Sequence, residues 1–236
     1  SPLAGQVRAR TEGDTVHFSL DLQAAARAAA KPPSPTASAA SPPIRLRLQG
    51  ARASGTWRQG LLALQTVDIQ ALQARLQGQS IAITLGAAPS ARGNLTLTLP
   101  GATASASGEL GPDAGAGQVQ LVLEQAERSQ AWLLALPGLS QALGGRKLQG
   151  QARLDARWQG GWNALRHPWQ AATGKAPATP APKGDFRLDA TLATPRLDIA
   201  LPPPAQSAVP TRVQLRNLKA RLDGSLAQAT LALDGQ

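Results

Sequence analysis

The side chains that could do chemistry are few and lie far apart. The chain has two histidines: His17 lies between Val16 and Phe18 in an alternating stretch, and His167 precedes Pro168. Neither has a second metal ligand nearby in the sequence, so we predict structural roles for both and no metal site. Cysteine is absent, which excludes a disulfide framework, a thiolate metal site and a cysteine nucleophile.

The acidic residues do not form a catalytic pair in the sequence. They are scattered, and the fourteen include Asp14, Asp21, Asp68, Glu109, Asp155, Asp189, Asp198 and Asp223. Glycosidases use two carboxylates flanking the scissile bond, but on a β-solenoid we expect them in a groove with Tyr and Trp, and this chain has no tyrosine. Gly111 to Gly117 has strand-like flanks and predicts a hairpin turn rather than a phosphate loop. We therefore expect a protein that is not an enzyme, with no catalytic residues and no cofactor.

The dominant signal in the sequence is alternation of apolar and polar residues. Leu95, Leu97 and Leu99 alternate with threonine. The same period appears at Ile44-Leu46-Leu48, Ile81-Ile83-Leu85, Val119-Leu121-Leu123, Leu154-Ala156-Trp158, Leu197-Ile199-Leu201 and Leu231-Leu233. About fourteen such segments can be counted, each ending at Gly, Pro or a similar turn signal.

This period predicts strands with one apolar face and one wet face. The apolar phase slips between Leu64 and Val67 and again between Leu215 and Leu218, which predicts bulges or bends. Strands that end in a tryptophan followed closely by glycine, at Trp57-Arg58-Gln59-Gly60 and Trp158-Gln159-Gly160, predict turns with an indole over the corner. The predicted fold class is all-β.

One segment has helical spacing instead. Trp132, Leu133 and Leu136 share a stripe, so we predict a short amphipathic helix near 126–143 that caps the core. Irregular, Pro-rich stretches at about 24–43, 174–184 and 202–210 are predicted to be loops of one sheet rather than linkers. A single elongated domain over 1–236 is expected.

Basic residues outnumber acidic ones, 24 to 14, for a formal charge of +10. They sit at alternate positions, as in Arg45-Arg47 and Arg212-Arg216, which is typical of solvated strand faces. With two Phe and no Tyr there are few stacking platforms for bases, so we expect no nucleic-acid partner. An anionic membrane surface remains an alternative partner.

Methionine is absent even from position 1, so the sequence is expected to be a fragment of a longer chain, with any signal peptide or anchor outside it.

The residue pattern along the whole sequence resembles that of the TamB and AsmA-like family. The resemblance lies in segments such as Leu148-Gln149-Gly150-Gln151-Ala152-Arg153-Leu154. It also lies in the turns that follow tryptophan and end in glycine, and in the helix with Trp132 followed by Leu-Pro-Gly-Leu. It implies a β-taco, an elongated sheet folded over an apolar groove like an open β-solenoid. It also implies a periplasmic location in a Gram-negative bacterium, anchored to the inner membrane by segments absent from this sequence.

The resemblance further implies that phospholipids move between the inner and outer membranes along the groove, with acyl chains as the ligand. The expected lining residues are Ile81, Ile83, Leu85, Leu95, Leu97, Leu99, Val119, Leu121 and Leu123. One alternative is a scaffold for outer-membrane β-barrel assembly and protein secretion, with an outer-membrane barrel partner of the TamA type. A surface β-solenoid adhesin is a further alternative.

Overall fold

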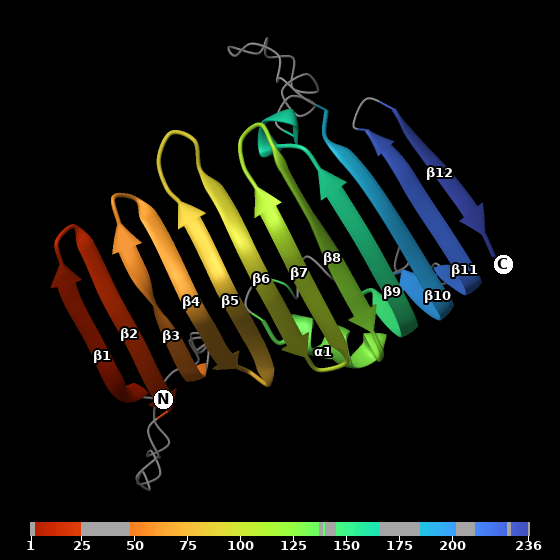
Figure 1. Cartoon of the computed structure of the whole chain (residues 1–236). Coiled ribbons are helices and arrows are strands. Elements are labelled where there is room, and N and C mark those ends of the chain that lie inside the picture. The colour runs from red at the N-terminus through yellow and green to blue at the C-terminus, as the bar shows by residue number, and fades with distance from the viewer. Residues whose placement is uncertain are drawn as a thin grey trace, which may run out of the picture.

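The described residues of the computed structural model form one sheet. The structure describes residues 3–24, 48–136, 139, 145–165, 185–201, 211–225 and 228–235. Twelve antiparallel strands follow one another in space in the same order as in the chain (Figure 1). They are β1 Leu3–Glu12, β2 Thr15–Ala24, β3 Leu48–Arg58, β4 Leu61–Ala71, β5 Ala74–Thr84, β6 Ser90–Leu99, β7 Ala102–Leu110, β8 Gly115–Leu123, β9 Lys147–Gln159, β10 Arg187–Leu201, β11 Thr211–Ser225 and β12 Ala229–Asp234.

This result confirms the all-β class predicted from the alternation. The predicted strand around Ile44 and Leu46 lies outside the described residues, as do almost all of the three predicted loops. The exception is Ala24, which is the last residue of β2. Among the described residues, no helix is long and apolar enough to cross a membrane.

Two-residue turns join several neighbouring strands. The turn between β3 and β4 places Gln59 and Gly60 at φ 44° and 85°, in agreement with the turn predicted after Trp57. The turn between β4 and β5 uses Leu72 and Gln73 at φ 50° and 68°. Two positive φ values match the twist of the flanking strands, but side chains other than Gly and Asn adopt them at a cost. The second turn is therefore held by something besides its own sequence.

Helix α1, Ala126–Leu134, supplies that support and confirms the predicted amphipathic helix. It lies at one end of the strands, in the connection between β8 and β9 (Figure 1). Trp132 donates its indole N–H to the Leu72 carbonyl at 2.6 Å, which fastens the strained turn. Ser129 is buried and donates to the Pro100 carbonyl at 3.0 Å. The helix thus caps hairpin turns. It ends at Leu134, short of the predicted 143, and residues 137–138 and 140–143 of the predicted span lie outside the described residues.

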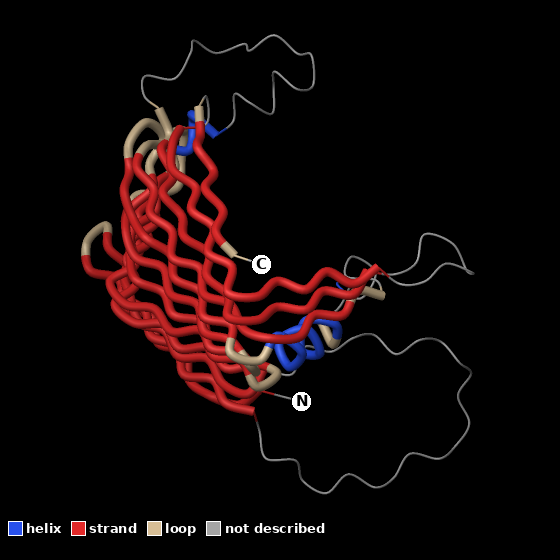
Figure 2. The backbone as a smooth tube through the Cα atoms, turned by 90° about the vertical axis from the view of Figure 1, so that its right-hand side faces the viewer, coloured by secondary structure: helices blue, strands red, loops and turns tan. Residues whose placement is uncertain are grey.

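A second helical turn, residues 162–165, caps the other end of the sheet (Figure 2). Trp162 donates its indole N–H to the Pro89 carbonyl at 3.0 Å. Asn163 donates its side-chain amide to Asp113 at 3.0 Å. Both contacts reach hairpin connections, so the two ends of the sheet are held in the same way.

Trp132 provides a test of this capping. Trp132→Phe keeps the ring but removes the hydrogen bond to Leu72, and we expect it to destabilise the chain by about 1 kcal/mol. Trp132→Ala also removes the packing of the half-buried ring and is expected to cost more. Thermal unfolding followed by circular dichroism measures both. Equal stability of the wild type and both variants would contradict the capping role.

The sheet is strongly curved rather than flat (Figure 2). The predicted phase slip near Leu64 is confirmed, because the pairing of β3 with β4 shifts between Ser54 and Gly55 and leaves Gln65 as an extra residue. Such a bulge bends its strand and increases the local twist.

A second line of irregularities crosses β9, β10 and β11. Gly150 has φ 118° and Asn217 has φ 49°. Between them, the pairing of β10 with β9 shifts between Ala193 and Arg196, on either side of Pro195. Asn217 lies within the predicted slip between Leu215 and Leu218, which is thereby confirmed as a local distortion. Beyond this line, residues 147–151 of β9, 196–201 of β10 and 211–216 of β11 form a three-strand extension that turns away from the rest of the sheet (Figure 2).

Candidate functional site: the apolar face of the sheet

One face of the sheet carries apolar residues in rows that cross every strand. Residues paired across neighbouring antiparallel strands point to the same face. One row, from β1 to β12, is Gly5, Leu22, Ala51, Ile69, Leu76, Leu97, Ala104, Leu121, Leu154, Leu192, Ala220 and Leu233.

The adjacent row has the same character. It is Val7, Leu20, Ala53, Val67, Gly78, Leu95, Ala106, Val119, Ala156, Ala190, Leu222 and Leu231. Neither row contains a polar side chain. We call the surface formed by these two rows and their apolar neighbours the apolar face.

The structure places eight of the nine predicted lining residues in strands with their side chains on this face. Leu97 and Leu121 share the first row, and Leu95 and Val119 share the second. Leu99 and Leu123 both pair with Ala102. Ile81 pairs with Leu64, and Ile83 with Leu62. Leu85 follows the end of β5, and its amide donates to the Gly60 carbonyl at 2.8 Å, so it belongs to a turn.

The sequence-based prediction missed the contribution of β7. Its alanines, Ala102, Ala104 and Ala106, alternate with Thr and Ser, and they join the leucine-rich strands β6 and β8 into one surface. Alternation of Ala with Thr and Ser was the available signal, but it is weaker than alternation of Leu with Thr.

No second layer of described elements covers the apolar face. Helix α1 and the turn at 162–165 hold the strand ends, and the strands contact each other only within the sheet. Of the described apolar residues, those that are buried are Ala51, Ala102, Ala126, Phe186 and Leu197. Leu95 is 41% exposed, and at the sheet margins Val7 and Leu233 reach 70% and 66%. A protein domain normally buries such a face against another layer, so this surface has the character of a binding surface.

A third row of the apolar face contains glycines, so no side chains project from the face at these positions. Gly93, Gly108 and Gly117 pair in sequence across β6, β7 and β8. The Trp158 indole lies over Gly117, because a methyl group added there would come within 2.2 Å of the ring. The indole of Trp158 therefore covers part of the neighbouring strand, and its N–H is buried without a hydrogen-bond partner in the described part of the chain.

The opposite face is mostly polar. One of its rows is Gln6, Asp21, Arg52, Asp68, Gln77, Thr96, Ser105, Gln120, Asp155, Thr191, Arg221 and Ala232. Ion pairs link neighbouring positions, as in Arg52 with Asp21 at 3.2 Å and Arg153 with Asp155 at 2.8 Å. The arginines of these described ion pairs therefore lie at solvated positions.

Two carboxyls on the polar face are held ionised by arginine. Hydrogen bonds from Arg75, one of 2.9 Å from its Nε, lower the pKa of Asp68 below its ordinary value of 3.8. Hydrogen bonds from Arg153 and then Gln120 lower the pKa of Asp155 in the same way. These groups are ordinary cross-strand and same-strand partners and form no acid–base pair.

The Asp68–Arg75 pair predicts a specific acid response. Because folding lowers the pKa of Asp68, the pair stabilises the fold above pH 3.8, and this contribution is lost as the pH falls through the lowered folded value. Arg75→Ala is expected to return the pKa of Asp68 towards 3.8 and to remove that part of the acid sensitivity. Carboxyl NMR titration measures the shift. An unchanged pKa of Asp68 in Arg75→Ala would refute this explanation.

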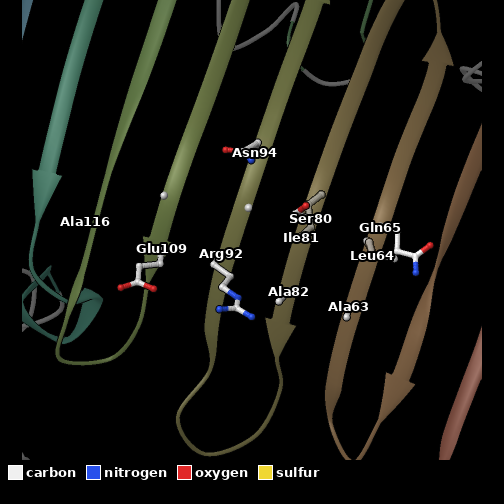
Figure 3. A pocket seen from close by; sticks show the side chains of 12 residues that line it. Ala63, Leu64, Gln65, Ser80, Ile81, Ala82, Arg92, Asn94, Glu109 and Ala116 are labelled. Atoms are coloured by element: carbon white, nitrogen blue, oxygen red, sulfur yellow. The ribbon is translucent and has the colours of Figure 1, made fainter.

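A hollow of about 790 Å³ opens on the polar side of β4 to β8 (Figure 3). The small side chains of Ala63, Ala82 and Ala116 form part of its wall. Arg92 and Glu109 project from neighbouring strands beside them (Figure 3). The hollow lacks histidine, cysteine and a second carboxylate, so its lining offers no catalytic pair.

The histidines and the other possible metal ligands do not lie together in the described structure. His17 is on the polar face, with its Nε2 3.8 Å from a Glu12 carboxylate oxygen. His167 lies outside the described residues. Within the described ranges, no group of three His, Cys, Asp or Glu residues could hold a metal ion.

The fold and the site thus define an open, single-layer antiparallel sheet with one apolar and one polar face. Comparison with models of known protein families, with curated proteins and with solved structures finds no match for this chain.

Proposed function

We propose that this chain is a non-enzymatic, lipid-conducting segment whose apolar face covers phospholipid acyl chains. The observation that carries the proposal is the continuity of apolar rows across all twelve strands, without a covering layer in the described structure. A catalytic or metal site would concentrate chemistry in a few residues, whereas here the same surface repeats on every strand.

The energetics support a continuous surface. Transferring one CH₂ group out of water is worth about 0.8 kcal/mol, so an acyl chain left in water costs on the order of 10 kcal/mol. With about 4.8 Å between strands, twelve strands give an apolar face about 50 Å wide across the sheet. Several acyl chains fit side by side or in succession without specific contacts.

The curvature of the sheet supports a groove. The bulge at Gln65 and the distorted line at Gly150, Pro195 and Asn217 bend the sheet in two places. A sheet closed over its apolar side would form the β-taco groove implied by the resemblance to the TamB and AsmA-like family. In that setting the protein would be periplasmic and would carry phospholipid between inner and outer membranes, with an outer-membrane barrel of the TamA type as a partner.

Site-specific photo-crosslinking in cells tests the proposal. A photoreactive amino acid at Leu97 or Leu121 faces the apolar side, while at Thr96 or Gln120 it faces the polar side of the same strands. We expect phospholipid adducts from the first pair and none from the second. Equal capture from both faces would overturn the proposal.

A further inference from the structure

The hollow on the polar side of β4 to β8 adjoins a second one. This neighbour has a volume of about 340 Å³ and lies towards the strand ends at Ser90 and Leu110. The two hollows share three lining residues, Ala82, Arg92 and Glu109. These three residues form one row of the sheet, because Arg92 pairs with Ala82 on one side and with Glu109 on the other. We call the combined space the polar trough.

Small side chains and a bulge make room for the polar trough. The row continues to Ala63 on β4 and to Ala116 on β8, so methyl groups form part of the floor on both sides of the charged residues. Beside the row, Ser80 and Ile81 of β5 lie opposite Gly93 of β6, and two residues opposite one make a bulge. Ser80 has φ 52°, a conformation that residues other than glycine seldom adopt. The bulge bends β5 next to the row, where the surface is hollowed.

The two charged residues of the polar trough do not neutralise each other. Arg92 and Glu109 lie directly opposite each other, yet within the described part of the chain neither forms an ion pair. Their charged groups are turned apart (Figure 3). Elsewhere on the same face a directly opposite pair does form one, since Arg52 contacts Asp21 at 3.2 Å. The polar trough therefore presents one positive and one negative group, both exposed, to a ligand.

This charge pattern restricts the ligand. A simple anion would be attracted by Arg92 and repelled by Glu109, and a simple cation would meet the reverse. We propose that the polar trough binds a small zwitterion, with its carboxylate or phosphate at Arg92, its ammonium at Glu109 and its linking carbons over the alanine floor. A guanidinium group suits either oxyanion, because it can donate two parallel N–H bonds to both. The inference concerns the face opposite the acyl-chain surface and does not depend on lipid binding.

The test uses the 236-residue chain and two zwitterions whose charged groups are joined through two carbons, β-alanine and O-phosphoethanolamine. Binding is followed in NMR titrations by the backbone amide signals of Ala82, Arg92 and Glu109. Because both protein charges are exposed, we expect saturable binding with a Kd in the millimolar range. Propionate and propylammonium resemble β-alanine but carry one charge each, and they should bind at least about threefold more weakly.

Substitutions separate the charges from the shape of the polar trough. Arg92→Gln and Glu109→Gln should each weaken binding of the zwitterions by about threefold. The exchange of Arg92→Glu with Glu109→Arg should preserve binding, since the ligand can then bind in the reverse orientation. Ala82→Leu keeps both charges but fills the floor, and it should abolish the saturable shifts. The matched control, Arg52→Gln with Asp21→Asn, removes the directly opposite ion pair elsewhere on the face and should leave binding unchanged.

Propionate or propylammonium binding as tightly as the zwitterions would overturn the inference. So would undiminished binding by both glutamine variants, or an equal loss in the control at Arg52 and Asp21. Vesicles of phosphatidylethanolamine present the same ammonium and phosphate on a membrane, and they are titrated at the same headgroup concentration. Amide shifts with the vesicles but not with soluble O-phosphoethanolamine would show that the ligand is a membrane surface, which contradicts binding of a small zwitterion.

Discussion

Replacing Leu97 and Leu121 together by aspartate is expected to lower the amount of phospholipid that co-purifies with this protein by at least about tenfold. The two residues lie in one row of the apolar face, separated only by Ala104 of β7. Two carboxylates there would have to lose hydration against an acyl chain, and an unpaired charge is excluded from apolar surroundings far more strongly than a methyl group is attracted to them. Lipid per protein is measured by mass spectrometry after gentle purification.

The matched control places the same charges on the other face of the same two strands. Thr96→Asp with Gln118→Asp changes the net charge equally, but both side chains lie on the polar face, Gln118 opposite Arg157. We expect this variant to retain its lipid and both variants to keep the circular dichroism of the sheet. Loss of lipid from both would show that charge or stability, rather than the apolar face, governs binding.

Gly117→Ala is expected to destabilise the centre of the sheet. A methyl group at Gly117 would lie 2.2 Å from the Trp158 ring and 2.5 Å from the Ser107 carbonyl oxygen. The indole and the backbone of β7 would both have to move. Overpacking of this kind costs about 1–3 kcal/mol, and each kcal/mol lowers Tm by about 2–4 °C in a chain of this size.

Gly50→Ala is the control for this substitution. Gly50 is also a strand glycine without a positive φ, but the nearest atom to its added methyl group is the Leu22 carbonyl oxygen at 3.5 Å, which is ordinary contact. Its Tm should stay close to that of the wild type in differential scanning calorimetry. If both variants unfold at the same temperature, the close packing of Trp158 over Gly117 does not stabilise the sheet.

Local sequence patterns predicted much of this fold because each strand has its own period-two signal. The alternation of leucine and threonine in β6 and the helical stripe at Trp132 both correspond to elements of the structure. The slip between Leu64 and Val67 located a bulge to within a residue. These features depend on neighbours in the sequence, and the alternation of the pleat makes them visible.

Other features depend on contacts between distant segments and left no local signal. Nothing around Leu72 predicts a turn at positive φ, because its support comes from Trp132, which is remote in sequence. Gln130 gives no sign in the sequence that its amide occupies the edge of β9.

The sequence predicted that the strands have an apolar face, but it did not identify all the residues that form this face. The leucines of β6 and β8 were found because their side chains are large and regularly spaced. The alanines of β7 and the glycines 93, 108 and 117 contribute to the same surface through their smallness, and small residues carry little periodic signal.

Alanine methyl groups allow the most direct measurement of the central claim, because they occur on both faces. Ala104, Ala106 and Ala156 lie on the apolar face, whereas Ala63, Ala82 and Ala116 lie on the polar face of the same sheet. In methyl NMR with phospholipid carrying a spin label near the end of its acyl chain, we predict strong broadening of the first three signals and little change in the others. Equal broadening of both sets, or broadening confined to the polar face, would contradict acyl-chain binding by the apolar face.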